Sequence, residues 1–499
     1  NVDRLRTARS NLYPINSVFR EQETSTLLAV RGEGVYVEMD DGTRLLEANS
    51  AMMNCSLGYS CEPVKRAIAQ QLEMLPYYNI HKGHATMQAL HLANVLCDLL
   101  REEGMSRAFF TSGGSESTDS SMKMCRHIWA VRGKPAKTRF GSFDISFHGM
   151  SYGASSLGHG SVTRRNVGPF LDTFALRAPD FYRHGGMPID EYVDAILKQI
   201  EETLIAADPS SIAAVYADPY SWPGGYQDTP AAYWKGLRAI CDRHEVLLAL
   251  DEIVTGFGRT GTWFAVQQYG IEPDMMLLSK GITAGYYPFG AVLLNKSLEE
   301  CFDAPEKMLL HGHTNCGQPV GCAAAIAVIE HIRDADVIAN VNARGVQLRA
   351  LLAVLQQYCP HVGDVRGRGV LCAVELVKDK KSKVPLIDAE VKRVFAACLE
   401  HGLKMREARS NQMLFAPPST ITESEILEVV TRLATAFATV GLVQAEGLDD
   451  LLARLQTTSH ENSLQPAPNP VMLHPQRYML ADEQRPVLQQ SSLPSKVAH

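Results

Sequence analysis

The stretch LLALDEIVTGFGRTGTWFAVQQYGIEPDMMLLSKG, residues 247–281, contains two apolar runs that both lead into charged residues. Asp251 and Glu252 follow the first run directly, and Lys280 follows the second run, residues 275–278, after one serine. Short runs that are apolar throughout are typical of strands covered on both faces of a parallel sheet. Open α/β sheets bind their ligands at the carboxyl ends of the strands, so all three charged side chains are candidates for a functional site.

Similar apolar runs recur on both sides of this stretch and are separated by segments of helical length. They are residues 107–110, 212–217 and 290–294. This alternation predicts an α/β large domain over residues 61–330, with a mainly parallel central sheet and helices on both faces.

The two ends of the chain predict a smaller α+β domain, built from residues 1–60 and 331–445. The first part contains a hairpin about the Asp41-Gly42 turn. The second part contains helix-like and strand-like segments and a final helix that opens with a capping box, Thr422 to Glu425. Residues 446–499 are expected to be a C-terminal extension with a Pro- and Gln-rich tail, and from about residue 457 this tail is expected to be a linker or loosely attached.

Composition narrows the classes of function. The 499 residues are 45% hydrophobic and 21% charged, with a net charge of -7, as in an ordinary globular protein without the basic face that nucleic acid requires. No apolar stretch approaches the length of a membrane span. The 11 cysteines contain no CxxC pair, which predicts free thiols in a reducing cytoplasm and neither a zinc site nor a disulfide framework. Small-molecule chemistry is favoured, with no nucleic-acid, membrane or metal partner.

Two glycine-containing motifs suggest different ligands. TSGGSES, residues 111–117, lies between an expected strand and an expected helix, where backbone amides at a helix N-terminus can bind phosphate; a flexible turn explains it equally well. GFGRTG, residues 256–261, matches the dinucleotide pattern GxGxxG. That pattern requires its first glycine at the strand end, and five residues intervene here, which argues against a dehydrogenase.

The charged residues at the strand ends each allow a structural and a functional interpretation. Asp251 could cap a helix or form a surface pair, but a buried carboxylate there needs a cationic or hydrogen-bonding partner. Lys280 could extend its amine to solvent, whereas burial in an apolar cleft would lower its pKa and make the amine a nucleophile for Schiff-base formation. A phosphate cradle, a buried carboxylate and such a lysine are together what pyridoxal phosphate requires, since the carboxylate keeps the pyridine nitrogen protonated.

Five motifs in a fixed order resemble a known family. They are FFTSGGSESTD, the stretch 247–281, HGHTNCGQPVGCAAA, VGDVRGRG and APPSTIT. The chain resembles the class III (omega) aminotransferases, which are pyridoxal-phosphate enzymes of fold type I. Within them it is similar to the branch that uses amines or omega-amino acids with pyruvate.

The resemblance implies a set of cofactor-binding residues and an assembly. Lys280 is expected to form the Schiff base and Asp251 to hold the pyridine nitrogen. Ile253 would pack on one ring face, and Thr314 would reach the phosphate from a neighbouring subunit, which implies a homodimer with active sites at its interface. The remaining residues expected at the cofactor are Gly113, Gly114, Ser115, Phe147, His148 and Asp218.

The substrate pocket departs from the family pattern. Phe147-His148 replaces the usual Tyr-His, Asp218-Pro219 replaces Glu-Pro, and Met53 stands where the branch commonly has tryptophan. The resemblance implies that Arg406 binds a substrate carboxylate, with Arg409 as its rival. The expected substrate-binding residues are Met53, Tyr78, Tyr152 and Arg406, and further candidates for lining the pocket are Tyr77, Phe147 and Trp222.

The resulting hypothesis is a transaminase that exchanges an amino group between an amine or omega-amino acid and a keto acid or aldehyde by a ping-pong mechanism. The second half-reaction would reverse the first with a keto acid such as pyruvate, and the hypothesis includes a role in specialised-metabolite biosynthesis. The alternatives are an aminomutase or decarboxylase on the same scaffold, since fold does not fix function, and a binding protein with a decayed site.

Overall fold

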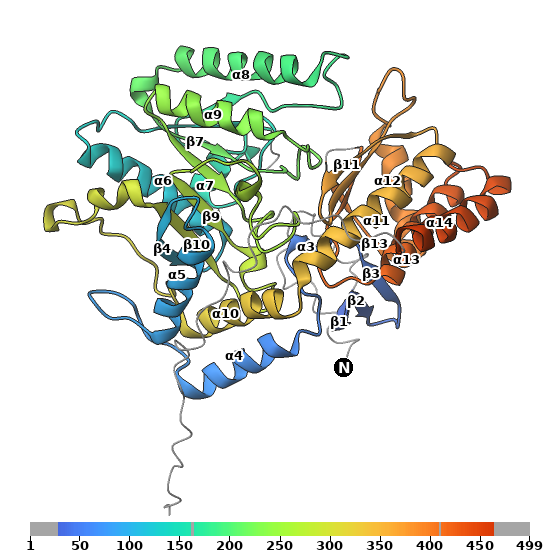
Figure 1. Cartoon of the computed structure of the whole chain (residues 1–499), viewed down its shortest axis with the longest axis horizontal. Coiled ribbons are helices and arrows are strands. Elements are labelled where there is room, and N and C mark those ends of the chain that lie inside the picture. The colour runs from blue at the N-terminus through green and yellow to red at the C-terminus, as the bar shows by residue number, and fades with distance from the viewer. Residues whose placement is uncertain (1–27, 161–163, 409–410, 464–499) are drawn as a thin grey trace, which may run out of the picture.

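The computed structural model describes residues 28–160, 164–408 and 411–463, which form two lobes in Figure 1. The larger lobe contains a seven-stranded sheet, and the smaller lobe contains two four-stranded sheets. In the smaller lobe, Leu403 pairs with Leu46, so segments near both ends of the chain build it together. The expected α/β fold with a smaller α+β domain from both chain ends is confirmed.

The central sheet has the strand order β4-β10-β9-β8-β7-β5-β6. Strand β10 is antiparallel to β4 and β9, and the other neighbours are parallel, as the apolar runs predict. Every residue of β7 to β10 is buried, which explains why these sequences are apolar except for Asp251 at the end of β8 and Asn295 at the end of β10. The strands are β4 (Met105–Thr111), β5 (Arg139–Phe143), β6 (Thr173–Leu176), β7 (Ile212–Ala217), β8 (Leu247–Asp251), β9 (Met275–Leu278) and β10 (Gly290–Asn295).

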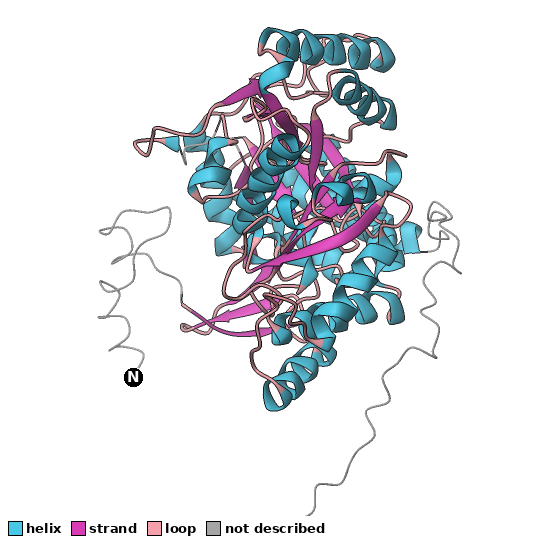
Figure 2. Cartoon of the chain, turned by 90° about the vertical axis from the view of Figure 1, so that its left-hand side faces the viewer, coloured by secondary structure: helices cyan, strands magenta, loops and turns pink. Residues whose placement is uncertain are grey.

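Helices cover both faces of this sheet, and Figure 2 shows the strands between them. Successive residues of a strand point to opposite faces. Accordingly, Leu248 and Leu250 of β8 share a core with helices α5, α9 and α10, whereas Leu247 and Ala249 pack with α6. The helices of this lobe are α4 (Glu62–Met74), α5 (Met87–Leu99), α6 (Gly114–Val131), α7 (Tyr152–Ser156), α8 (Ile189–Ala206), α9 (Ala231–Arg243) and α10 (Pro319–Asp334).

The smaller lobe has its own hydrophobic core, in which helices α11 to α14 pack against the sheets. One sheet has the order β1-β2-β3-β13 and the other β11-β12-β15-β14. Its strands are β1 (Ala29–Glu33), β2 (Tyr36–Met39), β3 (Arg44–Glu47), β11 (Val362–Arg368), β12 (Leu371–Leu376), β13 (Leu403–Lys404), β14 (Arg406–Ala408) and β15 (Gln412–Phe415). Its helices are α11 (Val337–Tyr358), α12 (Asp388–Glu400), α13 (Glu423–Thr439) and α14 (Leu448–Ser463).

Several short elements connect these parts. The short helix α3 (Ser50–Met53) follows β3, and the other short elements named here are 3-10 helices. They are η3 (Pro209–Ser211), η4 (Ala265–Gln268), η5 (Lys280–Ile282), η6 (Lys296–Cys301), η7 (Pro305–Lys307) and η8 (Ala445–Gly447).

Two local predictions are confirmed in the smaller lobe. Strands β2 and β3 form the expected antiparallel hairpin. At the start of α13, the amide of Glu425 donates to Oγ1 of Thr422, and the amide of Thr422 donates to the Glu425 carboxylate, which is the expected capping box.

The expectation of a loosely attached tail from about residue 457 is wrong for residues 457–463, which form the end of α14 (Leu448–Ser463). Leu451 and Leu455 on this helix are fully buried in the small-lobe core, and Nε2 of Gln347 on α11 donates to Oγ of Ser459. The tail composition obscured the apolar face of this helix. Residues 464–499 lie outside the described part of the chain, and the domain boundaries at 60, 330 and 445 stay a prediction.

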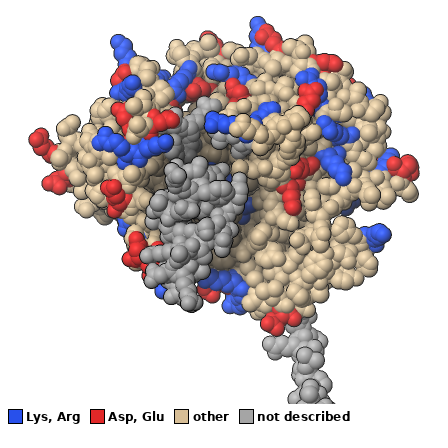
Figure 3. Space-filling model, turned by 180° about the vertical axis from the view of Figure 1, so that it is seen from behind, with Lys and Arg blue, Asp and Glu red and all other residues tan. Residues whose placement is uncertain are grey.

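The surface carries both signs of charge. On the face in Figure 3, Lys and Arg side chains alternate with Asp and Glu over the atoms that are not grey. Within the three described ranges, no helix combines the length and apolarity that crossing a membrane demands.

Candidate active site

Lys280 and Asp251 line one cavity at the carboxyl ends of β8 and β9. Asp251 is the last residue of β8 and pairs in register with Leu277 of the neighbouring strand β9, and Lys280 begins the turn after that strand. The cavity has a volume of about 170 Å³. It is lined by Gly114, Ser115, Phe147, His148, Gly149, Asp218, Pro219, Tyr220, Ser221, Trp222, Asp251, Ile253, Val254, Ser279 and Lys280.

Lys280 has a strained backbone and a perturbed amine. Its φ of 44° lies in the left-handed region that side chains other than glycine seldom adopt. Burial lowers the pKa of Lys280 to about 8; the charge of Asp251 opposes this shift, and those of Arg406 and Arg259 add to it. A lysine amine with this pKa is partly neutral near pH 7 and therefore nucleophilic.

Asp251 is held by two donors. Nδ1 of His148 donates to Oδ2 of Asp251 at 2.8 Å, and the amide of Ile253 donates to Oδ1 at 3.1 Å. Both side chains of the pair are buried. Burial favours neutral His148, but the hydrogen bond to Asp251 and the charges of Asp218 and Asp251 raise the pKa of His148 above its usual value. The two donors therefore fix the orientation of the Asp251 carboxylate in the wall of the cavity.

The N-terminus of α6 forms another wall. Helix α6 begins at Gly114, directly after Gly113, and its 18 residues give it the anion-attracting amides and dipole of a long helix. A Cβ on Gly114 would lie 2.8 Å from Cδ1 of Ile253, so the backbone approaches here only because the residue is glycine. Oγ of Ser115 accepts a hydrogen bond from the amide of Met150 at 3.0 Å. The predicted phosphate cradle is therefore beside the cavity, on the strand-to-helix turn.

Phe147 and Asp218 reach the same cavity from neighbouring loops. The Phe147 ring lies edge-to-face against Trp222, with 5.3 Å between ring centres. Burial raises the pKa of Asp218 to about 7, and the proximity of His148 and a hydrogen bond from Ser221 oppose the shift. Asp218 can therefore exchange a proton near neutral pH.

Besides Gly113, Tyr77 and Arg406, four predicted residues do not line this cavity within the described chain. Thr314 lies on a loop before α10, where its carbonyl accepts a hydrogen bond from Tyr77 at 2.8 Å. The hydroxyl of Tyr78 contacts Nδ1 of His84 at 3.2 Å. Tyr152 stacks on Phe170 and is 55% exposed, and Met53 is buried with its sulfur 3.1 Å from the Tyr226 hydroxyl.

Arg406 stands next to the cavity without lining it. Its Cζ lies 4.6 Å from the centre of the Trp222 ring, and its Nη1 donates to the sulfur of Met52 at 2.6 Å. The methionine beside Arg406 is thus Met52, which directly precedes the predicted residue Met53. Arg409, the rival candidate, lies outside the described residues.

The loop after β7 contributes residues that the motif comparison did not identify. Tyr220 and Ser221 line the cavity, and Tyr220 has a φ of 50°. A cluster of turn-forming residues, DPYSWPGG, directly after a buried strand was the available signal.

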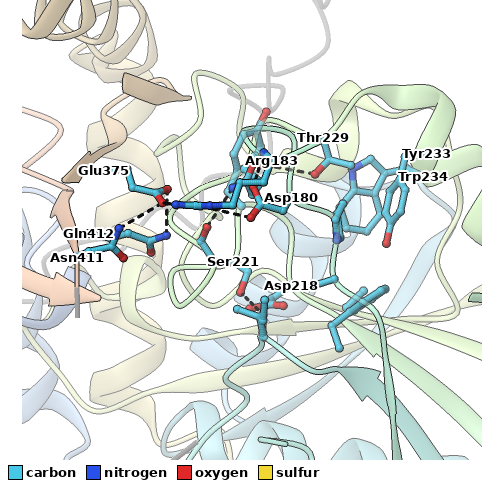
Figure 4. A pocket seen from close by; sticks show the side chains of 18 of the residues that line it. Asp180, Arg183, Asp218, Ser221, Thr229, Tyr233, Trp234, Glu375, Asn411 and Gln412 are labelled. Carbon is cyan, nitrogen blue, oxygen red and sulfur yellow. Dashed lines mark hydrogen bonds and ion pairs between the residues drawn. The ribbon is translucent and has the colours of Figure 1, made fainter. Parts of the chain in front are cut away.

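A second cavity of about 290 Å³ adjoins the first and shares Asp218, Tyr220 and Ser221 with it. Figure 4 shows Glu375, Asn411 and Gln412 on one side of it and Trp234 on the opposite side. The larger and smaller lobes thus both contribute walls.

The dinucleotide interpretation of GFGRTG does not fit the structure. Residues 256–261 form turns after β8, and no helix begins there to bind a pyrophosphate. Arg259 within this motif is buried, and its Nη1 donates to the carbonyls of Ala416 at 2.9 Å and Pro417 at 2.6 Å. This segment therefore connects the two lobes.

Comparison with known proteins gives an independent result. The family model for aminotransferase class-III matches residues 18–437. The chain is 33% identical over 430 residues to a putrescine–pyruvate aminotransferase of Pseudomonas aeruginosa, a match that covers 84% of this chain and 92% of that protein.

Solved structures agree with the sequence match. An amine transaminase from an uncultivated Pseudomonas species, in its PLP-bound form, has a TM-score of 0.82 at 35% identity and covers 86% of this chain and 98% of its own. An (S)-enantioselective omega-transaminase from Thermomicrobium roseum has a TM-score of 0.83 at 31% identity and covers 88% and 99%.

The described residues fit pyridoxal phosphate, because one cavity combines a nucleophilic lysine, a buried carboxylate and a glycine cradle that a Cβ would fill. The family match extends over most of the chain, and the fold is that of the solved transaminases. The chain therefore belongs to the class III aminotransferases, whose cofactor is pyridoxal phosphate.

Proposed function

We propose that this aminotransferase moves an amino group from a primary amine or omega-amino acid to pyruvate or a similar keto acid or aldehyde, in two half-reactions. The observation that carries the proposal is the placement of Lys280 and Asp251 in one cavity. The putrescine–pyruvate aminotransferase among the relatives supports an amine donor and a keto-acid acceptor.

Lys280 serves both as the anchor for the cofactor and as the acid-base group. When bound, pyridoxal phosphate supplies an aldehyde that condenses with amines and a protonated ring that withdraws electrons from the carbon bearing the amino group. Nζ of Lys280, with a pKa of about 8, takes the proton from that carbon and releases it again in the same exchange. In the second half-reaction, Nζ of Lys280 carries out the same two proton transfers in reverse order.

The other walls position the cofactor. Asp251, oriented by His148, would hold the ring nitrogen, and Asp218 would contact a polar group of the ring. Phe147 and Ile253 supply apolar surface for the ring faces. The phosphate would bind Gly113, Gly114 and Ser115 at the start of α6.

Arg406 is the proposed partner of a substrate carboxylate. Its guanidinium lies over Trp222, which lines the cavity of Lys280. A guanidinium binds a carboxylate through two parallel hydrogen bonds. Tyr78, Tyr152 and Met53 lie outside this cavity in one chain, so a role for them in substrate binding requires the partner subunit or a rearranged pocket.

A homodimer is proposed because exposed apolar side chains occur on the loop that carries Thr314 and on α4 and α5, which both pack against α10 directly after that loop. The hydroxyl of exposed Tyr77 donates to the Thr314 carbonyl, and Leu310 on the same loop is 86% exposed. Further exposed apolar residues of α4, α5 and this loop are Leu72, Met74, Met87, Leu90 and Met308. Apolar surface of this kind is typical of an interface, across which Thr314 of the partner subunit would reach the phosphate.

The proposed location is the cytoplasm. All eleven cysteines are free thiols, the state that a reducing compartment maintains. Cell fractionation would test this.

The function is tested by incubating the holoenzyme with putrescine, or a panel of other primary amines, and pyruvate. We expect alanine and the carbonyl product of the donor in equal amounts. A decarboxylase would release carbon dioxide without alanine, and an aminomutase would retain the amino group on the donor. Lys280→Ala should abolish alanine formation, whereas Lys198→Ala on the exposed face of α8 should not.

A further inference from the structure

Trp222 links the cavity of Lys280 to Arg406. One side of its indole meets the edge of Phe147, and the guanidinium of Arg406 lies 4.6 Å from its ring centre. A guanidinium within about 6 Å of an indole face is attracted to its electron-rich surface, and tryptophan is the strongest of the aromatic residues in this role.

The turn that carries Trp222 is held from within. The carbonyl of Trp222 accepts a hydrogen bond from the amide of Gly225 at 3.1 Å, and the carbonyl of Ser221 accepts one from the amide of Tyr226 at 3.0 Å. Gly225 has a φ of 71°, a left-handed conformation that suits glycine. The backbone at Trp222 is therefore fixed before any substrate binds.

The smaller lobe holds the same turn from outside. Nε of Arg366 on β11 donates to the Gly225 carbonyl at 2.6 Å. Arg366 itself pairs with Glu375 at 2.9 Å and Asp364 at 2.7 Å. Burial alone would raise the pKa of Glu375, but Arg366 and Arg183 hold it below its usual value. Figure 4 shows Glu375 beside Arg183, which contributes to this network.

Arg406 has few other partners for its charge. No ion pair joins it to a carboxylate among the described side chains, and its Nε is buried with no hydrogen-bond partner there. Burial lowers the pKa of Arg406. Burying half of a cation without a paired anion costs free energy. The contacts of the Arg406 guanidinium with the indole face and the Met52 sulfur offset part of this cost.

We propose that Trp222 determines the balance between carboxylate-bearing and uncharged substrates by holding Arg406 in a position with which a substrate carboxylate must compete. The inference rests on the proposed function and adds a positioning residue to it. Trp222 acts through Arg406 and does not itself bind the carboxylate.

The two substrate classes then differ in whether their binding breaks the contact between Arg406 and Trp222. A carboxylate pairs with a guanidinium more strongly than an aromatic face does, so it binds while displacing the indole contact. An uncharged amine or aldehyde leaves Arg406 on Trp222 and creates no unpaired charge. Removing the indole should therefore favour carboxylates and disfavour uncharged substrates.

The test uses the holoenzyme and the variants Trp222→Leu, Trp222→Phe and Arg406→Gln. We expect the ratio of kcat/KM for pyruvate to kcat/KM for butanal to rise by about fivefold or more in Trp222→Leu, as the loss of one partly buried cation–π contact predicts. Trp222→Phe keeps an aromatic face and should fall between this variant and the wild type; it also serves if Trp222→Leu fails to fold.

A binding measurement separates this effect from catalysis. Propionate carries a carboxylate but no reacting group, and calorimetry should show it binding about fivefold or more tightly to Trp222→Leu than to the wild type. Arg406→Gln should lose propionate binding, and adding Trp222→Leu to it should leave the substrate ratio of Arg406→Gln unchanged, because the two residues act on one contact.

An unchanged or lower ratio in Trp222→Leu and Trp222→Phe, or an equal change in the Arg406→Gln background, would overturn the inference. Such an outcome leaves the proposed function standing, provided that the wild type forms alanine. Absence of amino transfer in the wild type with every amine would instead contradict the proposed function.

Discussion

Lys280 combines a left-handed backbone conformation with burial at the end of β9, and these conditions distinguish it from the surface lysines of the chain. The apolar run before it supplies the burial, and Asp251 on the neighbouring strand limits the fall in its pKa. The position of Lys280 in the sheet therefore determines the nucleophilicity of its amine as much as the residue type does.

The lowered pKa predicts how the protein captures its cofactor. With a pKa of about 8, about one Lys280 amine in ten is neutral at pH 7, against fewer than about one in a thousand for an ordinary lysine. Only the neutral amine attacks an aldehyde, so the capture rate of pyridoxal phosphate by apoprotein should rise with pH and level off above about pH 8. Stopped-flow absorbance would measure it, with Nα-acetyl-lysine as the control; a rate that still rises beyond pH 10 would contradict a lowered pKa.

Individual site residues were predictable to different degrees. Lys280 and Asp251 follow buried strands, and strand ends of one sheet meet at one edge, so their proximity could be read from the sequence. Tyr78 and Tyr152 could not be placed in this way, because they lie on connections whose course depends on tertiary packing. Trp222 was visible as a pocket candidate, but its contact with Arg406 depends on the approach of the smaller lobe.

At the scale of the element, the start of α6 is shaped by a close contact between two segments. A Cβ on Gly114 would lie 2.8 Å from Cδ1 of Ile253, closer than atoms pack without displacement. Gly114→Ala should therefore weaken pyridoxal phosphate binding about tenfold, the effect of about 1.4 kcal/mol of overpacking. Fluorescence titration of apoprotein would measure the affinity.

The matched control for this substitution is Gly447→Ala, because a Cβ there meets nothing within 4 Å. It should bind the cofactor as the wild type does. Equal affinities for wild type and Gly114→Ala would show that the glycine cradle does not hold the phosphate.

Helix α14 shows an element that sequence reasoning missed. Leu451 and Leu455 are four residues apart and fully buried, which is a helical signal, but the proline-rich sequence beyond residue 464 dominated the composition of the region. A shift in composition therefore locates the start of a tail only approximately when a helix lies directly before that tail.

The buried face of α14 predicts a stability effect. Leu455→Ala should lower the free energy of unfolding by about 2–5 kcal/mol, because it leaves a cavity in the small-lobe core. The exposed neighbour Gln456→Ala should change it by less than about 0.5 kcal/mol. Urea unfolding followed by circular dichroism measures both, and similar midpoints for the two variants would mean that α14 is not packed as described.

At the scale of the whole molecule, the two-lobed fold was predictable because each lobe has its own periodic signals, whereas the surface proposed for the dimer was not. Its exposed apolar residues come from α4, α5 and the loop of Thr314, which are distant in sequence, and α4 and α5 both pack against α10, the helix that follows this loop. Their proximity appears only when the chain is folded.

A mixed dimer tests the proposed assembly. Lys280→Ala and Thr314→Ala homodimers should each be impaired, since one lacks the lysine and the other the contact across the interface. A dimer with one subunit of each kind contains one complete site, formed by Lys280 of the Thr314→Ala subunit and Thr314 of the other. We expect co-expression to restore about half of the activity per mixed dimer; no restoration, or a mass of 54.9 kDa in solution, would contradict a shared site.

The central claim, that Lys280 carries the cofactor of this aminotransferase, is tested most directly by borohydride reduction of the holoenzyme followed by digestion and mass spectrometry. Reduction fixes pyridoxal phosphate to the lysine that binds it. The structure predicts the added mass on Lys280, in the peptide that contains the sequence after β9. An added mass on another lysine, or none in protein with bound cofactor, would contradict the account.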